Sequence, residues 1–416
     1  MAKKSKPFSV AKLKSADDFK SMVKHIESGP SYRKPIAFGI CRVQFGQIQK
    51  DKILTCQFPV VNWQENFGTA ALFQSALGIN AAGEELVAPL TPNFLKTCLN
   101  AYAPFIKEAV GSAHQNVQVI KQLAALATKS KAQLNNFRAV FLYADAEPKS
   151  VPAIYLKLAA MSACKVKPRS VNLTGIFGKL ENLAWSGTNA FELDYLRQNE
   201  IAWKVVGKFP AIDYVDKFPR YLMQVLPQNS VRILDGSKVR FGAHLAEGTT
   251  VMPGASYINF NAGTLGPVMV EGRISSSAIV GANSDVGGGA SIMGVLSGGN
   301  STPISIGEKC LLGANSVTGV PLGDGCIIDA GIAVLAGTKI FVPEQEIAKI
   351  EAVNPGLKLS QFGKSAADGR WLKAADFAGR NGLHFRLDSV SGQMVVARSK
   401  REVQLNQDLH GLKKVG

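Results

Sequence analysis

The sequence is poor in histidine and has no paired cysteine motif. It contains five histidines and six cysteines among 416 residues, and none of the cysteines belongs to a CxxC pair or a Cys/His cluster. A zinc site built on such motifs is therefore not predicted. The basic N-terminus, MAKKSKPFSVAKLK, lacks the apolar run of a signal peptide. Together with the scattered cysteines, it predicts a cytoplasmic protein whose thiols are structural.

Phosphate-binding motifs and membrane-spanning runs are also missing. Residues 1–228 hold no GxGxxG and no GxxxxGK[ST] pattern, so we expect no nucleotide-binding fold there. The longest run without charge, residues 249–270, is long enough to span a bilayer. It contains Pro253, Gly254 and Asn259, which disfavour a membrane helix, and we predict no membrane-spanning segment.

Acidic residues number 31 against 47 lysines and arginines, which gives a net charge of +16. Between residues 229 and 341, however, there are six basic and seven acidic residues, so the excess lies in the flanking parts. No helix-turn-helix, zinc-finger or RNP pattern accompanies the charge, and we expect no nucleic-acid partner. A positive field would instead suit phosphorylated or polycarboxylate substrates.

What the sequence does have is a six-residue glycine period. Aliphatic or aromatic residues repeat on the same period, for example Ile233, Val239 and Leu245. An α-helix would repeat every 3.6 residues or so and a lone strand about every two residues, so neither explains the pattern. A flexible glycine-rich linker is also excluded, because it has no apolar residue that recurs at a fixed spacing. The period predicts a parallel β-helix with three short strands in each coil of about 18 residues. The glycines of the period stand at positions 236, 242, 248, 254, 266, 272, 307, 313, 319, 325, 331 and 337.

The chain is expected to divide into three regions. We predict an α/β N-terminal domain at 1–228, the β-helix at 229–341, and a C-terminal region at 342–416. Within the β-helix, the polar stretch MGVLSGGNSTP (293–303) predicts an external loop. Strands are expected at 36–47, 52–61 and 138–145, helices at 93–110, 113–129, 152–165 and 344–353, an insertion at 352–381, and β segments at 382–398 and 402–409.

One segment is more specific than the repeat: NFNAGTLGPVMVEGRISSSAIVGANSDVGGGASIMGVLSGG (259–299). With ISIGEKCLLGANS (304–316) and the closing FRLDSVSG and VQLNQDLH, it resembles the tetrahydrodipicolinate N-succinyltransferase family, in its longer form found in actinobacteria and some other bacteria. The resemblance covers about 230–416 and implies a left-handed β-helix, a homotrimer and no tightly bound cofactor. It implies transfer of the succinyl group of succinyl-CoA to the amino group of L-2-amino-6-oxopimelate, in lysine and diaminopimelate synthesis.

The resemblance assigns catalysis to Glu271, in MVEGRIS, either as a general base or as a nucleophile that forms an acyl anhydride. The sequence leaves both roles open, as well as a third in which Glu271 is a solvated corner residue like Glu247. His244 is a rival base, because many β-helix acyltransferases use histidine, but it lies outside the signature. It is the one histidine of the coils, which excludes the three-histidine zinc site of γ-type carbonic anhydrases.

Arg273 matches the arginine with which the family binds its ligand, and its planar fork suits a carboxylate. An ordinary surface arginine is the alternative. Small residues would line the succinyl-CoA site and let the ligand approach the backbone. The contacts implied by the resemblance are Gly288, Ser291, Gly294, Ala314, Asp329, Ala330, Gly337, Lys349, Arg386, Leu387, Asp388 and Ser389, with those from Lys349 onward assigned to CoA phosphates across the insertion.

Some members of this family have acidic residues that could hold magnesium on the trimer axis. Here Ser237 and Gly254 lie near those positions, so no metal is predicted. Two other functions stay open at this point. The chain could be an acyltransferase that uses acetyl-CoA or acts on a sugar-nucleotide amine, or a non-catalytic β-helix assembly subunit.

Overall fold

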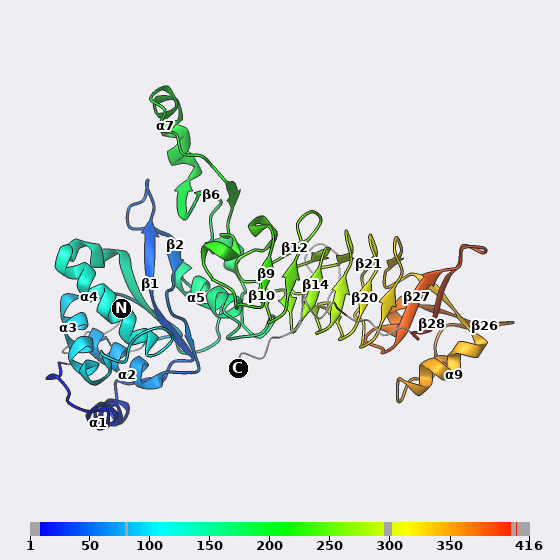
Figure 1. Ribbon diagram of the computed structural model, residues 1–416, viewed down its shortest axis with the longest axis horizontal. Helices are drawn as coiled ribbons and strands as arrows, with labels where there is room; N and C mark the ends of the chain where they lie inside the picture. Colours follow the sequence, from blue (N-terminus) through cyan, green and yellow to red (C-terminus); the bar gives the residue numbers. More distant parts are fainter. Residues whose placement is uncertain (1–8, 80–81, 295–301, 401–404, 406–416) are drawn as a thin grey trace. The chain divides into compact units, whose positions relative to one another are not determined.

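The computed structural model describes residues 9–79, 82–294, 302–400 and 405, and the chain divides into two compact units (Figure 1). The first unit comprises Met1–Ala160 and Val171–Pro219, and the second comprises Met161–Ser170 and Arg220–Gly416. Within the described residues, no helix is long and apolar enough to cross a membrane.

The first unit is built on an antiparallel sheet with the strand order β2-β1-β5-β4, and β3 pairs with β1. The strands predicted at 36–47, 52–61 and 138–145 are confirmed as β1, β2 and β5. A smaller sheet has the order β7-β6-β8. The strands are β1 (Ala37–Phe45), β2 (Ile53–Gln57), β3 (Asn62–Trp63), β4 (Glu85–Pro89), β5 (Phe137–Leu142), β6 (Leu183–Ser186), β7 (Asn189–Glu192) and β8 (Tyr214–Asp216).

Helices accompany both sheets of this unit. Helix α1 begins with a capping box, in which Ser15 accepts from the backbone of Asp18 and Asp18 accepts from that of Ser15. The helices predicted at 113–129 and 152–165 are confirmed as α4 and α5. The helices are α1 (Ala16–Glu27), α2 (Phe67–Leu77), α3 (Pro92–Ala101), α4 (Gln115–Lys129), α5 (Val151–Ser162, which crosses into the second unit), α6 (Ile176–Lys179) and α7 (Leu193–Val205).

The helix predicted at 93–110 is shorter than expected, because α3 ends at Ala101. Pro104 has no backbone N–H to continue the helix, and it disfavours the helical conformation of the residue before it. The chain continues as the 3₁₀ helix Ala103–Phe105 and a series of turns.

Three parallel sheets form the faces of a β-helix in the second unit (Figure 1). The chain passes through them in turn, so neighbouring strands of a sheet belong to successive coils. The first face comprises β9 (Arg232–Ile233), β11 (Thr250–Val251), β14 (Val268–Val270), β17 (Ser284–Val286), β20 (Leu311–Leu312) and β22 (Ile327–Ile328). The second face comprises β12 (Tyr257–Ile258), β15 (Arg273–Ile274), β18 (Ser291–Ile292), β21 (Val317–Thr318) and β23 (Ala333–Val334). The third face comprises β10 (His244–Leu245), β13 (Gly263–Thr264), β16 (Ile279–Val280) and β19 (Ser305–Ile306).

The coils differ in length. Gly263 pairs with Ile279, and Ile279 pairs with Ser305, so one coil takes 16 residues and the next takes 26. The longer coil includes the segment 293–303, which was expected to form an external loop. Residues 295–301 of that segment lie outside the described residues.

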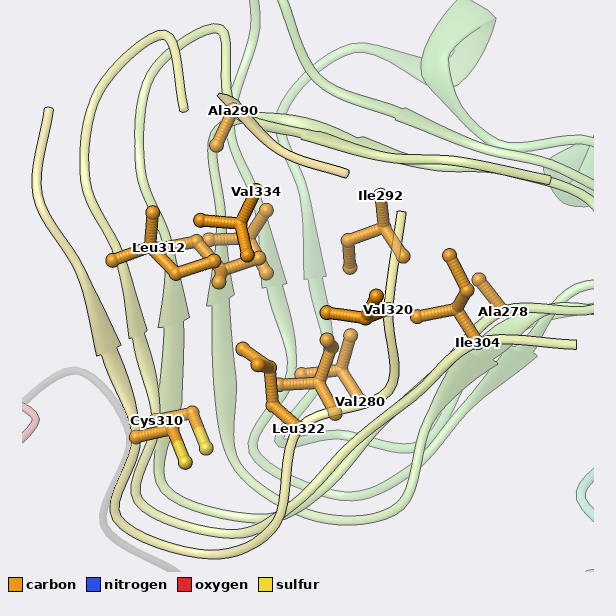
Figure 2. Packing of buried hydrophobic residues seen from close by; sticks show 14 of the residues in the cluster. Ala278, Val280, Ala290, Ile292, Ile304, Cys310, Leu312, Val320, Leu322 and Val334 are labelled. Atoms are coloured by element: carbon orange, nitrogen blue, oxygen red, sulfur yellow. The ribbon is translucent and has the colours of Figure 1, made fainter. Parts of the chain in front are cut away.

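Most strands turn apolar side chains into the β-helix, where they stack on their equivalents in adjacent coils, and Thr264 and Thr318 take the inward position on β13 and β21. Figure 2 shows Ile292, Leu312 and Val334 converging there with Val280 and Leu322. All five are at least 97% buried. Burial of one such side chain stabilises the fold by roughly 1.5–3 kcal/mol, so the repeated apolar position holds the stack together.

The glycines of the six-residue period serve two different purposes. Gly254 has φ +82°, in the left-handed region that favours glycine, and turns the chain at a corner. Gly313 has no such φ, but a Cβ there would lie 2.5 Å from the backbone nitrogen of Ala330 on the next coil. Glycine is therefore required at some of these positions by the turn of the chain and at others by the close stacking of successive coils.

A C-terminal sheet extends the first face. Strand β27 (Leu383–Leu387) pairs in parallel with β22 and forms a hairpin with β28 (Met394–Arg398). Strand β24 (Lys339–Pro343) pairs with β28 and β26 (Gly369–Lys373), and β26 pairs with β25 (Lys364–Ala366). The predicted insertion at 352–381 thus supplies two strands of this sheet. Helix α9 (Glu344–Ala352) confirms the prediction at 344–353, and 402–409 lie outside the described residues apart from Leu405.

Candidate active site

Glu271 lies at a two-residue corner, here called the notch, on the edge where the first and second faces meet. The corner of its coil consists of Glu271 and Gly272, between β14 and β15. The corner of the preceding coil has five residues, 252–256, and that of the following coil has four, 287–290. A shorter corner lies closer to the axis of the stack than its neighbours, and Gly272 is accordingly buried. The corners of both neighbouring coils are thus longer than the corner that carries Glu271.

The following corner leaves space beside the Glu271 carboxylate. A Cβ on Gly288 would lie 3.7 Å from Glu271 Oε2, so the absence of a side chain there opens one side of the carboxylate. Backbone hydrogen bonds fix this arrangement, from Glu271 N to Val286 O at 2.8 Å and from Gly289 N to Glu271 O at 3.4 Å. Glu271 is half-buried, and its backbone is tied to the following coil by these hydrogen bonds.

Arg273 and Ser291 lie next to the notch on the second face. They are a cross-strand pair on β15 and β18. Arg273 donates to Ser291 Oγ from Nη2 at 2.6 Å and from Nε at 3.1 Å. The serine therefore orients the guanidinium two residues from Glu271, where it can bind an anionic ligand group.

The predicted contacts farther along the chain fall on the same edge. A ladder of backbone hydrogen bonds runs from Glu271 N to Val286 O, Gly287 N to Leu312 O, Gly313 N to Ile328 O, and Asp329 N to Phe385 O. Successive coils therefore place Ala314, Asp329 and Ala330 on the edge that carries Glu271, and Arg386 follows on β27. Four strand spacings of about 4.8 Å separate Glu271 from Arg386, roughly 19 Å.

Gly294 and Gly337 lie on the opposite rim of the second face, since each follows a strand of that face. A Cβ on Gly294 would lie 3.0 Å from Ser275 Cβ, whereas a Cβ on Gly337 would have no described atom within 4 Å. The predicted glycines and alanines thus border both sides of the second face, whose central outward residues include Ser291, Val317 and Ala333.

The remaining predicted contacts lie beyond the coils. Lys349 is on α9, where its Nζ donates to Glu346 Oε1 at 2.6 Å. Asp388 builds the turn of the β27–β28 hairpin, because its Oδ1 accepts from Val390 N, Ser391 N and Ser391 Oγ. The hydrogen bonds from Ser391 and Val390 lower the pKa of Asp388 below its usual value. Leu387 and Ser389 are exposed in the same hairpin.

His244, the rival base, is on the third face. It is 6% exposed, and its Nδ1 lies 2.9 Å from the carbonyl oxygen of Thr264. Burial lowers the pKa of His244 below its usual value, although the Thr264 hydrogen bond opposes that effect. This histidine is covered and belongs to a different face from Glu271, so the structure does not bring the two together.

A different histidine, His384, was not predicted and lies on the edge. Its Nε2 is 2.7 Å from Asp329 Oδ1. No motif in the sequence pairs these residues, because they are brought together by β27 joining the first face.

A magnesium ion does not fit the corner near Ser237 and Gly254. Lys238 Nζ donates to the Gly254 carbonyl oxygen at 2.7 Å, so a cationic side chain already uses that oxygen. Throughout the part of the chain that the structure describes, no three His, Cys, Asp or Glu side chains are grouped as a metal site.

Comparisons with known proteins match both units of the chain. The family model of the tetrahydrodipicolinate N-succinyltransferase N-terminal region matches residues 17–178, and that of the middle region of the same enzyme matches 180–220. A model of the hexapeptide repeat of succinyl-transferase matches 303–336. The N-terminal part therefore carries a family signal, although it contains no short motif from which the family could be named.

Several curated relatives are named 2,3,4,5-tetrahydropyridine-2,6-dicarboxylate N-succinyltransferase. One from a Nitratiruptor species is 57% identical over 404 residues, covering 96% of this chain and 100% of the relative. One from Campylobacter jejuni is 50% identical over 404 residues, with the same coverage. A crystal structure described as that of a 2,3,4,5-tetrahydropyridine-2-carboxylate N-succinyltransferase from Campylobacter jejuni matches with a TM-score of 0.86 and 48% identity, covering 95% of this chain and 100% of that one. The chain belongs to the tetrahydrodipicolinate N-succinyltransferase family, a family of acyltransferases.

Proposed function

We propose that this protein transfers the succinyl group of succinyl-CoA to the amino group of L-2-amino-6-oxopimelate, the open form of tetrahydrodipicolinate, in lysine and diaminopimelate synthesis. The observation that carries the assignment of the site is the notch. It combines a carboxylate, an open side at Gly288 and an oriented guanidinium on two adjacent coils. Acyl transfer to an amine needs a group that takes up the amine proton or attacks the thioester, and a carboxylate can do either.

Two mechanisms use Glu271 differently. As a general base, its carboxylate takes a proton from the amine while the nitrogen attacks the thioester carbonyl carbon, and the CoA thiolate leaves. As a nucleophile, a carboxylate oxygen attacks the same carbon and expels the thiolate; the amine then attacks the succinyl carbonyl of the mixed anhydride, the bond to the Glu271 oxygen breaks, and the amine proton passes to the freed Glu271 carboxylate or the thiolate. In both cases Arg273 would bind the terminal carboxylate of the succinyl group and hold the thioester at the notch.

The length of the edge suits the arm of CoA. About thirteen bonds separate the thioester sulfur from the nearer diphosphate phosphorus, which is roughly 15 Å at the rise of an extended backbone. The distance from Glu271 to Arg386 is on the order of 19 Å by strand spacing. With the thioester at Glu271, the arm would pass Ala314 and Ala330, and Arg386 would reach the phosphates.

The decisive experiment replaces Glu271 with glutamine and measures CoA release from succinyl-CoA plus acceptor. Glu247, an exposed carboxylate at another corner of the coils, provides the matched control. We expect Glu271→Gln to lose turnover by a factor of about 100 or more, as for loss of a general acid–base group, while Glu247→Gln keeps it. Full turnover by Glu271→Gln with an unchanged melting temperature would refute the assignment.

A second measurement separates the two mechanisms and the donors. A nucleophilic Glu271 should release CoA from succinyl-CoA without acceptor, up to one equivalent per site, whereas a general base should release none. Running acetyl-CoA in the same assay tests the donor. A protein that used acetyl-CoA as well as succinyl-CoA, or that bound neither, would support one of the alternative functions given by the sequence.

We further propose a cytoplasmic homotrimer whose β-helix is left-handed and occupies residues 229–341, between an α/β domain at 1–228 and a C-terminal region at 342–416. The family resemblance supports the trimer and the handedness, and the six cysteines, all free thiols, suit a reducing compartment. Light scattering tests the assembly, with an expected mass of three times the 44.4 kDa of the chain. A monomeric mass would contradict it.

A further inference from the structure

His384 and Asp329 form a hydrogen-bonded pair on the edge that carries Glu271. Their side chains are 28% and 45% exposed, and His384 Nε2 lies 2.7 Å from Asp329 Oδ1. An ionised carboxylate accepts hydrogen bonds and cannot donate them, so the imidazole nitrogen is the donor. The bond occupies Oδ1 and leaves Oδ2 as a further acceptor.

The backbone fixes both residues as well. Asp329 N donates to Phe385 O at 3.0 Å, and Ile327 pairs with His384 in the parallel ladder between β22 and β27. The backbone ladder thus fixes the main chain of Asp329, and the imidazole of His384 fixes its carboxylate. An exposed aspartate without such ties would sample several rotamers, and ordering it upon ligand binding would cost side-chain entropy.

The position along the edge indicates what the carboxylate would meet. Three strand spacings separate Asp329 from Glu271, roughly 14 Å. An extended CoA arm advances by about 3.5 Å for every three bonds. If the thioester lies at Glu271, a point roughly 14 Å along the arm is therefore at its pantoyl end, next to the diphosphate. The pantoyl group carries a hydroxyl, a hydrogen-bond donor that a carboxylate oxygen accepts.

We propose that His384 is a positioning residue for the acyl donor, which holds the Asp329 carboxylate so that Oδ2 accepts a hydrogen bond from the pantoyl part of the CoA arm. This inference rests on the proposed function. The imidazole also places a donor beside a carboxylate that would otherwise repel the nearby diphosphate. His384 does not touch the reacting atoms, so its effect falls on donor binding rather than on the chemical step.

The test compares two donors and three variants. Succinyl-CoA reaches Asp329, whereas S-succinyl-N-acetylcysteamine ends before the pantoyl group and does not. His384→Ala removes the donor nitrogen, and His384→Gln replaces it with an amide nitrogen at a similar distance from the backbone. Ser365→Ala is the control, because it removes the hydrogen bond that Arg370 Nη1 donates to Ser365 Oγ within the C-terminal sheet, and neither residue is assigned to donor binding.

We expect His384→Ala to raise KM for succinyl-CoA about tenfold, with kcat changed less than about twofold, as for loss of one hydrogen bond to a charged group. His384→Gln should recover most of the loss. The same variants should match the wild type with the truncated donor, and Ser365→Ala should match it with both. An equal rise in KM with the two donors, or no rise with succinyl-CoA, would overturn the proposal. His384 would then serve only to stabilise the β27–β28 hairpin.

Calorimetric titration with CoA itself gives a readout that does not depend on turnover. The dissociation constant of His384→Ala should rise by the same factor as KM. If the wild type binds CoA but transfers no succinyl group, the proposed function fails, while the change in CoA affinity still decides the role of His384. If the wild type turns over and His384→Ala binds CoA as tightly as the wild type does, this inference alone fails.

Discussion

Arg273 reaches along the second face to the neighbouring coil and donates two hydrogen bonds to the same oxygen, Ser291 Oγ, at 2.6 and 3.1 Å. A similar contact joins Arg169 Nη2 to Ser305 Oγ, also at 2.6 Å, on the third face. The two pairs share their chemistry but not their surroundings, because the Arg273 pair adjoins the notch. Comparing them separates an effect on ligand binding from an effect on the fold.

Ser291→Ala should weaken donor binding. Without the serine, the guanidinium loses its fixed orientation, and we expect KM for succinyl-CoA to rise by a factor of roughly 3–10, since each hydrogen bond to a charged group is worth a modest net amount. Ser305→Ala provides the matched control and should leave KM unchanged. Initial rates at varied succinyl-CoA check both. Equal effects of the two substitutions would mean that the serine acts through stability.

Part of the site could be predicted from the sequence because it lies in one short segment. Glu271, Arg273, Gly288 and Ser291 all belong to the signature, and the structure places them on adjacent coils. The notch could not be predicted. A regular glycine period implies corners of equal length, and the sequence does not mark where each strand ends, so the short corner at Gly272 became visible with the strand registers.

Gly288→Val should impair catalysis while leaving the fold intact. Gly288 does not have a positive φ, and an added Cβ would be in ordinary contact at 3.7 Å from Glu271 Oε2. The larger side chain would occupy the open side of the carboxylate and displace the thioester, which can cost about 100-fold in kcat/KM for a displacement near 1 Å. Gly288→Ala should lose less. A melting temperature near that of the wild type is the control, and undiminished turnover by the valine variant would place the acyl group elsewhere.

Gly281→Ala should destabilise the β-helix. The added Cβ would lie 2.6 Å from both the carbonyl carbon and oxygen of Gly307, and the backbone of a packed coil cannot move away freely. We expect a loss of about 2 kcal/mol, as for overpacking, and a melting temperature lower by several degrees. Gly337→Ala is the control, since its Cβ would have no described atom within 4 Å. Similar melting temperatures for both variants would show that the coils yield more readily than their spacing suggests.

The fold was more predictable where local signals repeat. The glycine period and the phased apolar residues indicate the coils, and the corresponding side chains, such as Val280 and Leu312, are buried. Long-range pairing was not predictable. The segment 352–381 was predicted only as an insertion, yet its strands β25 and β26 complete a sheet with β24. The contact of His384 with Asp329 likewise depends on β27 pairing with β22, a choice that no local pattern records.

His244→Asn should keep turnover and change the response to acid. His244 is covered on the third face, and its Nδ1 contacts Thr264 O, which an asparagine amide can replace. Burial, with a smaller contribution from Lys167, lowers the folded-state pKa of His244 below its ordinary 6.5. The unfolded state therefore binds a proton more readily, so this histidine's contribution to stability is present above about pH 6.5 and is lost as the pH falls through the lowered pKa.

Melting temperatures between about pH 7.5 and about pH 5 should fall more steeply for the wild type than for His244→Asn. Equal slopes would contradict the burial argument. Loss of turnover by a variant that melts like the wild type would make His244, rather than Glu271, the candidate base.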